Sequence, residues 1–201
     1  MKLYGFPMSP NSRRVHLTLE EIGEPYEYVV VDLTQGEHKQ PEYLALNPNG
    51  RVPTFVDGGY VIWESHAIMQ YLAAKFPDRG LDGGNPHERG DISKWLFTNA
   101  AHLGPAASRV FSHTIRLPED RRIERVAEEG RVEVIKTLGI LDEALKGKEW
   151  LVSARLTLAD ISFAPTIAFA PMLGFDLSPF PQVTAWLERY KERPAFKKVY
   201  G

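Results

Sequence analysis

Residues 47–72 constrain the fold more than any other stretch, because turn signals, two strand-like runs and a helix start follow one another without a gap. Pro53 cannot donate to a sheet ladder, so it belongs at a strand start, an edge or a bulge. The sequence Asp57-Gly58-Gly59 reads as a β-hairpin turn between runs at 54–56 and 60–63. The apolar spacing that follows predicts an amphipathic helix with Ser65 as its candidate N-cap.

The predicted helix start also has a chemical reading. Free backbone N–H groups and a partial positive charge at a helix N-terminus favour a bound anion, so the amides of Glu64 and Ser65 and the Ser65 hydroxyl suit a carboxylate. The alternative is that Ser65 only caps its helix.

The segment resembles the glutathione-binding core of the cytosolic glutathione transferases, whose first domain has a thioredoxin-like fold. The resemblance rests on a Val-Pro pair followed about ten residues later by Glu-Ser-x-Ala-Ile. It implies that Val52, before a cis Pro53, pairs its backbone with the cysteinyl part of glutathione. It also implies that Glu64 and Ser65 hold the γ-glutamyl end.

Composition fits a globular protein that can bury a core: the chain has 201 residues, of which 43% are hydrophobic and 25% are charged. A formal net charge of -2 offers no basic footprint for nucleic acid. No window of 18 apolar residues and no signal-peptide pattern is present, so we expect no membrane span and a cytoplasmic location.

The chain contains no cysteine. This excludes disulfides, zinc-thiolate sites and any mechanism that forms a mixed disulfide with the protein's own thiol. The cysteine-dependent branches of the family therefore do not apply, and any reactive thiol belongs to the ligand. No histidine or carboxylate spacing indicates a metal site.

The N-terminal part alternates between strands and helices. Strand-like runs at 2–6 and 26–31 flank a helix that begins near Arg13 and ends at Gly23, and a short helix is expected at 41–46. With the hairpin and helix above, the order is βαβ, short helix, ββα. We expect an α/β thioredoxin-like domain over 1–77, a linker over 78–89 that is rich in glycine and polar residues, and an all-helical domain over 90–201.

Ser9 is the candidate catalytic residue. A serine just before a helix can place its hydroxyl where developing negative charge is favoured. The loop resembles that of the phi and theta classes, in which such a serine donates a hydrogen bond to the glutathione sulfur. Ser12 is the rival, although its place directly before Arg13 suits helix capping.

The phi-class resemblance adds further candidates. It implies that His38 and Lys39 contact the glycine end of glutathione, and it places Arg51, which stands where glutamine is common, at the same site. For the electrophile it suggests residues from the first loop and from the segment 102–111. These candidates are Met8, Asn11, Leu103, Ala107 and Phe111, each of which could equally be core.

Beyond the linker the pattern is helical. A long helix over 92–110 contains Pro105, which predicts a kink or break. A second helix covers 127–145, and Thr157 with Asp160 forms a capping box. A last helix over 183–190 is expected to stop at Pro194.

The sequence therefore predicts a serine-type glutathione transferase of a phi/theta-like, bacterial or plant-like class. It would use glutathione as cosubstrate and no metal, and would add the glutathione thiolate to a hydrophobic electrophile. The alternatives are glutathione-dependent reduction of organic hydroperoxides and a non-catalytic interaction module. The family implies a homodimer with the helices after the linker at the interface. The net charge and the lack of a long apolar window lead us to expect no nucleic acid or membrane partner. The sequence does not name the electrophile.

Overall fold

The computed structural model describes residues 1–201, which form two compact units: 1–82 together with 193–201, and 83–192. The elements of the first unit are β1 (Lys2–Gly5), α1 (Pro10–Ile22), β2 (Glu27–Val30), η1 (Glu37–Lys39), α2 (Pro41–Leu44), β3 (Thr54–Asp57), β4 (Tyr60–Trp63), α3 (Ser65–Lys75), η2 (Pro77–Arg79) and α9 (Pro194–Tyr200). Those of the second are α4 (Pro86–Thr98), η3 (Asn99–Leu103), α5 (Gly104–Phe111), η4 (Ser112–Arg116), η5 (Glu119–Arg121), α6 (Glu124–Leu145), α7 (Leu158–Phe169), η6 (Ala170–Leu173) and α8 (Pro181–Lys191).

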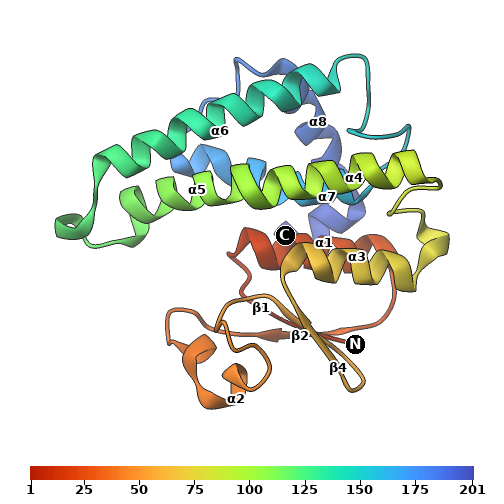
Figure 1. The fold of residues 1–201 in the computed structure, drawn as a ribbon, viewed down its shortest axis with the longest axis vertical. Coiled ribbons are helices and arrows are strands. Elements are labelled where there is room, and N and C mark those ends of the chain that lie inside the picture. The colour runs from red at the N-terminus through yellow and green to blue at the C-terminus, as the bar shows by residue number, and fades with distance from the viewer. The chain divides into compact units, whose positions relative to one another are not determined.

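The first unit contains a four-stranded mixed sheet in the order β2-β1-β3-β4. β1 pairs parallel with β2, and β3 pairs antiparallel with both β1 and β4. Asp57 pairs with Tyr60 across a two-residue turn, which confirms the predicted hairpin. Helices α1 and α3 pack side by side over one face of the sheet (Figure 1), while α2 lies on the other side.

Side-chain alternation along β1 separates two cores. Leu3 points to one face and is fully buried. Tyr4 and the following Phe6 pack on the opposite face against a cluster of Val31, Tyr43 and Val52. This second cluster lies directly behind the 51–53 turn, so it supports the segment from which the resemblance was drawn.

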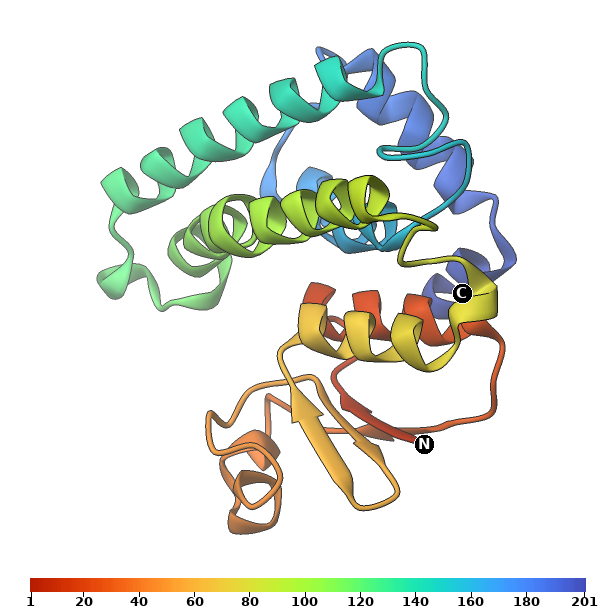
Figure 2. The ribbon, with the colours of Figure 1, turned by 45° about the vertical axis from the view of Figure 1, so that its right-hand side comes forward.

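The second unit is helical, as predicted. Helices α4 and α5 form one long rod (Figure 2), and α5 packs against α6. The expected disturbance before Pro105 is a π-helical turn, η3, and not a break. Because proline has no N–H and crowds the preceding turn, the wider turn lets the helix continue past it.

The capping box at the start of α7 is also present. Asp160 Oδ2 accepts the Thr157 N–H at 3.0 Å, while Oδ1 accepts hydrogen bonds from the Leu151 N–H at 2.9 Å and from the Trp186 indole N–H at 3.0 Å. Asp160 is fully buried. Burial raises the pKa of Asp160, and these hydrogen bonds oppose that effect. The side chain thus joins the 151–157 loop and α8 to the start of α7.

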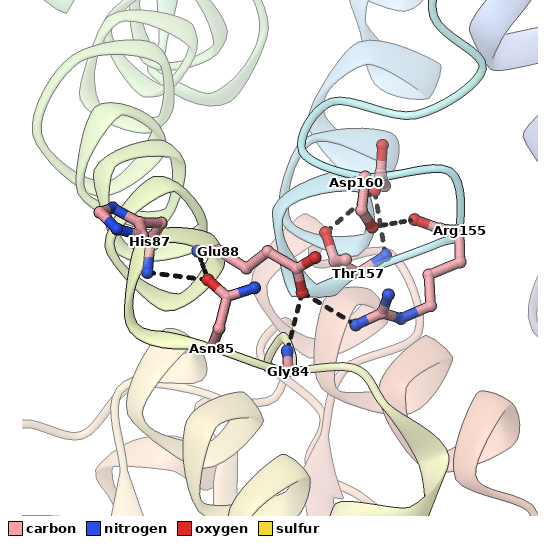
Figure 3. Close-up of polar contacts among 8 residues, drawn as sticks. Gly84, Asn85, His87, Glu88, Arg155, Thr157 and Asp160 are labelled. Atoms are coloured by element: carbon pink, nitrogen blue, oxygen red, sulfur yellow. Dashed lines mark hydrogen bonds and ion pairs between the residues drawn. The ribbon is translucent and has the colours of Figure 1, made fainter.

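The range predicted as a linker overlaps the first turn of α4. Figure 3 shows Asn85 at the start of this helix, where its side chain accepts the N–H groups of His87 and Glu88 at 3.0 Å each. Glu88 in turn accepts the Gly84 N–H at 2.7 Å and pairs with Arg155 at 3.0 Å. Helix α4 therefore begins at Pro86, inside the range 78–89.

The C-terminal residues differ from the prediction in two ways. Pro194 does not end the last helix, because α8 ends at Lys191 and Pro194 begins a further helix, α9. A proline fits the first turn of a helix, where its missing N–H costs nothing. Helix α9 also packs on α1 in the first unit, whereas the sequence assigned these residues to the helical domain 90–201.

Candidate active site

Ser9 lies at the N-terminus of α1 as its N-cap, with φ -79° and ψ 120°. Its hydroxyl oxygen accepts a long hydrogen bond of 3.4 Å from the Ser12 N–H. The Ser9 hydroxyl donates no hydrogen bond within the chain, and the side chain is only partly buried. The proton of this hydroxyl is therefore free to be donated to an acceptor held at the start of α1.

Ser12 does not cap the helix, which corrects the role expected for it. Its side chain is fully buried, and its hydroxyl oxygen accepts the Phe6 N–H at 3.1 Å. Ser12 therefore ties the end of β1 to α1. Ser9 takes the capping position because α1 begins three residues earlier than the apolar pattern indicated.

The Val52–Pro53 peptide bond is cis, as the resemblance implied. Both residues are buried, yet both line a cleft with about 350 Å³ of empty space, part of it open to solvent. The lining residues are Asn11, Asn47, Asn49, Arg51, Val52, Pro53, Glu64 and Ser65. The cleft lies within the first unit and joins the start of α1, the 47–53 turn and the start of α3.

A buried hydrogen-bond network holds the 51–53 turn. The Arg51 carbonyl accepts hydrogen bonds from the Tyr43 hydroxyl at 2.7 Å and from the Asn47 amide at 2.8 Å. Tyr43 and Asn47 also contact the Thr54 hydroxyl at 2.8 and 3.1 Å. Buried networks whose members are satisfied hold one geometry, so this one fixes the backbone that presents Val52 to the cleft. The Arg51 residue itself is exposed.

The start of α3 corrects the expected cap. Glu64, not Ser65, is the N-cap, with φ 71° and ψ 111°. Glu64 is the one non-glycine residue with positive φ, a backbone conformation that is costly for such residues and that gathers at binding sites. Ser65 is the first helical residue, and its hydroxyl oxygen accepts a hydrogen bond from Arg14 Nη1 at 3.1 Å.

Arg14 was not expected from the sequence. It is 3% exposed, and burial lowers the pKa of its guanidinium to about 10. The available signal was that a charged residue stands among the buried positions of α1, between Ser12 and Leu17. An arginine is seldom buried without a specific role.

Lys39 and His38 come from η1. The Lys39 ammonium donates to the Gly50 carbonyl at 3.0 Å, and a Cβ at position 50 would stand 2.8 Å from Lys39 Nζ. Glycine at 50 thus makes room for the lysine next to the turn. Burial, followed by the charge of Lys39, lowers the pKa of His38.

The electrophile candidates fall in both units. Met8 is half exposed and Asn11 lines the cleft. In the second unit, Leu103 is 1% exposed, whereas Ala107 and Phe111 are partly exposed. Phe111 packs edge-to-face on Phe169 with ring centroids 5.8 Å apart.

No group of three or more His, Cys, Asp or Glu side chains is arranged to hold a metal ion. No helix combines the length and the apolar character needed to span a membrane.

Comparison with known proteins agrees with the geometry. Residues 1–74 match the glutathione S-transferase N-terminal domain, and residues 102–194 match the C-terminal domain of the same family. The chain is 38% identical over 209 residues to glutathione S-transferase 3 of Zea mays, covering 99% of this chain and 92% of the relative.

Solved structures give the same picture. Ure2p in complex with glutathione superposes with a TM-score of 0.92 at 28% identity, covering 98% of this chain and 96% of that one. The transferase URE2P6 from Phanerochaete chrysosporium, in complex with oxidized glutathione, has a TM-score of 0.91 at 35% identity and covers 99% and 94%. The chain belongs to the glutathione S-transferase family.

Proposed function

We propose that the protein conjugates glutathione to hydrophobic electrophiles, with Ser9 holding the thiolate. The observation that carries this proposal is the free hydroxyl proton of Ser9 at the N-terminus of α1, within the unit whose cleft Val52, Glu64 and Ser65 line. A hydrogen bond donated to sulfur, together with the positive end of the helix, stabilises the charged form of a thiol and lowers its pKa.

The cleft, together with η1, supplies a partner for each part of the tripeptide. The cysteinyl amide of glutathione pairs with the Val52 backbone, which the network of Tyr43, Asn47 and Thr54 keeps in position. The γ-glutamyl carboxylate meets Ser65 and the open amides at the start of α3, and the glycine carboxylate meets Lys39 and His38. Arg51 contributes backbone near the cysteinyl part.

Lowering a thiol pKa from about 8.5 towards neutrality raises the nucleophilic fraction by roughly tenfold per unit at pH values well below it. An electrophile bound beside the sulfur then reacts with the advantage of proximity. In the first unit we propose Met8 and Asn11 as contacts of the electrophile. In the second unit the candidates remain those that the family resemblance suggests, Leu103, Ala107 and Phe111.

The test compares Ser9→Ala with Ser12→Ala. Ultraviolet difference absorption near pH 6.5 reports the thiolate of bound glutathione, and conjugation of a chloronitrobenzene reports turnover. Ser9→Ala should bind glutathione with nearly unchanged affinity, yet lose the thiolate band and about 10²–10³-fold of the turnover, as for one oxyanion-hole donor. A Ser9→Ala protein that retains both signals would refute the assignment.

We also propose a homodimer, with helices after the linker at its interface. Phe97 on α4 is 68% exposed, the highest exposed fraction among the large apolar side chains, and this suits burial against a second copy. Sedimentation of the wild type and of Phe97→Glu tests this: a monomeric wild type, or a charged variant that remains equally dimeric, would exclude α4 from the interface.

A further inference from the structure

Met8 is an exposed sulfur beside the active-site serine. Its side chain is 50% exposed in the loop before α1, directly preceding Ser9. Its sulfur accepts a hydrogen bond from Arg13 Nη2 at 3.9 Å. The chain offers two internal comparisons: Met172 is equally exposed at 51% and has no such donor, and Met69 is fully buried.

Arg13 is held in place from its other side. Its guanidinium carbon lies 4.1 Å from the ring centroid of Tyr200. Tyr200 in turn stacks on Phe196, with centroids 4.0 Å apart and planes 4° from parallel. A cation over an aromatic face is attracted to it, so α9 provides a platform that keeps the guanidinium next to Met8.

We propose that Met8 is a site of reversible oxidation, at which an organic hydroperoxide converts the thioether to a sulfoxide with the assistance of Arg13. The sulfur attacks the terminal peroxide oxygen, so that an S–O bond forms and the O–O bond breaks. The electron pair of the broken bond leaves with the alkoxide oxygen, which takes the proton of the hydroperoxide and departs as the alcohol. Sulfur loses two electrons and the peroxide gains them.

The position of Arg13 suits this step. Negative charge develops on the peroxide oxygens as the sulfur attacks, and the Arg13 guanidinium, which already lies against the sulfur, is a charged donor that stabilises that charge. The product also fits between the Met8 sulfur and Arg13 Nη2. A sulfoxide oxygen on the sulfur can accept a hydrogen bond of about 2.9 Å from Nη2, and with a bent angle at that oxygen the sulfur and Nη2 stay near their present separation. The chain has no cysteine to take the oxidant first.

The experiment exposes the full chain to cumene hydroperoxide without glutathione and follows each methionine by peptide mass mapping. Met8 should oxidise about two- to tenfold faster than Met172, which is the rate ratio that the net free energy of one hydrogen bond would produce. Met69 should stay reduced and so reports that the protein remains folded. Met172→Leu is the matched control and should leave the Met8 rate unchanged.

Two variants test the role of Arg13. Arg13→Gln should slow Met8 oxidation to the Met172 rate. Tyr200→Leu keeps the arginine but removes its platform, and should slow Met8 by a smaller factor. Methionine sulfoxide reductases should restore the thioether. Equal rates at Met8 and Met172 in the wild type would overturn the proposal, as would a Met8 rate that neither variant changes or a sulfoxide that the reductases do not reduce.

Discussion

Asp160 offers the sharpest test of what holds the helical unit together. Replacing it with alanine leaves the N–H groups of Leu151, Thr157 and Trp186 without their acceptor, and all three residues are less than 4% exposed. A buried donor without a partner costs about 1–3 kcal/mol, so the three donors together lead us to expect a loss of about 3–9 kcal/mol in the free energy of unfolding. Against a typical total of about 5–15 kcal/mol, this brings the unit close to unfolding.

The assay is urea denaturation followed by circular dichroism and by tryptophan emission, since Trp186 is one of the donors. Asp160→Asn keeps one acceptor oxygen but places an NH2 group against the donors that the other carboxylate oxygen served. Its loss of unfolding free energy should therefore lie between those of wild type and Asp160→Ala. The matched control is Asp176→Ala, which removes an exposed carboxylate that accepts the Ser178 N–H at 2.9 Å. It should change stability little, because water replaces the acceptor. A loss below about 1 kcal/mol for Asp160→Ala would refute the reasoning.

Three other outcomes follow from the first unit. Gly50→Ala should displace Lys39, because the new Cβ would lie 2.8 Å from Lys39 Nζ and position 50 has a φ of 56°. Glutathione binding measured by calorimetry should weaken, and unchanged affinity would show that Lys39 does not bind the tripeptide. Burial raises the pKa of Glu20, but hydrogen bonds from Lys198 and Tyr26 outweigh burial and leave the pKa lowered. The contribution of Glu20 to stability should therefore be lost on acidification below its unfolded pKa of 4.5. Glu20→Gln should flatten that part of the profile of urea midpoint against pH. Burial, then Arg14, lowers the pKa of His66 to about 2, so the folded state binds fewer protons than the unfolded state below pH 6.5. Stability should therefore fall by up to about 2 kcal/mol between pH 6.5 and 5, and a profile that is flat there would contradict an imidazole that is kept neutral in the folded state.

The fold was largely predictable because local signals agreed with one another. The Gly58-Gly59 turn, the apolar periods of α3 and α6, and the Thr157–Asp160 box are written in short stretches of sequence. Where they failed, two interpretations of one residue competed. Pro194 can end a helix or begin one, and only the packing of α9 on α1 decides between them.

The candidate site was predictable in its backbone features and not in its supporting side chains. Val52 and Pro53 follow from a motif, whereas the Arg14–Ser65 hydrogen bond joins residues 51 positions apart. The capping roles were also exchanged. Ser9 caps α1 in place of Ser12, because N-cap preference does not distinguish two serines and tertiary contacts choose between them. Glu64 occupies the N-cap position of α3 without a capping hydrogen bond from its side chain, and Ser65 becomes the first helical residue.

The return of α9 to the first unit makes that unit discontinuous in sequence. Arg193 forms a two-point ion pair with Glu21 at 2.6 Å per contact, so residues separated by the whole helical unit complete one structure. During synthesis the sheet and its first helices leave the ribosome long before the segment that finishes them. We therefore expect residues 1–82 alone to be an unfinished folding unit, and we expect the loss of the last nine residues to weaken the domain that lies at the opposite end of the chain.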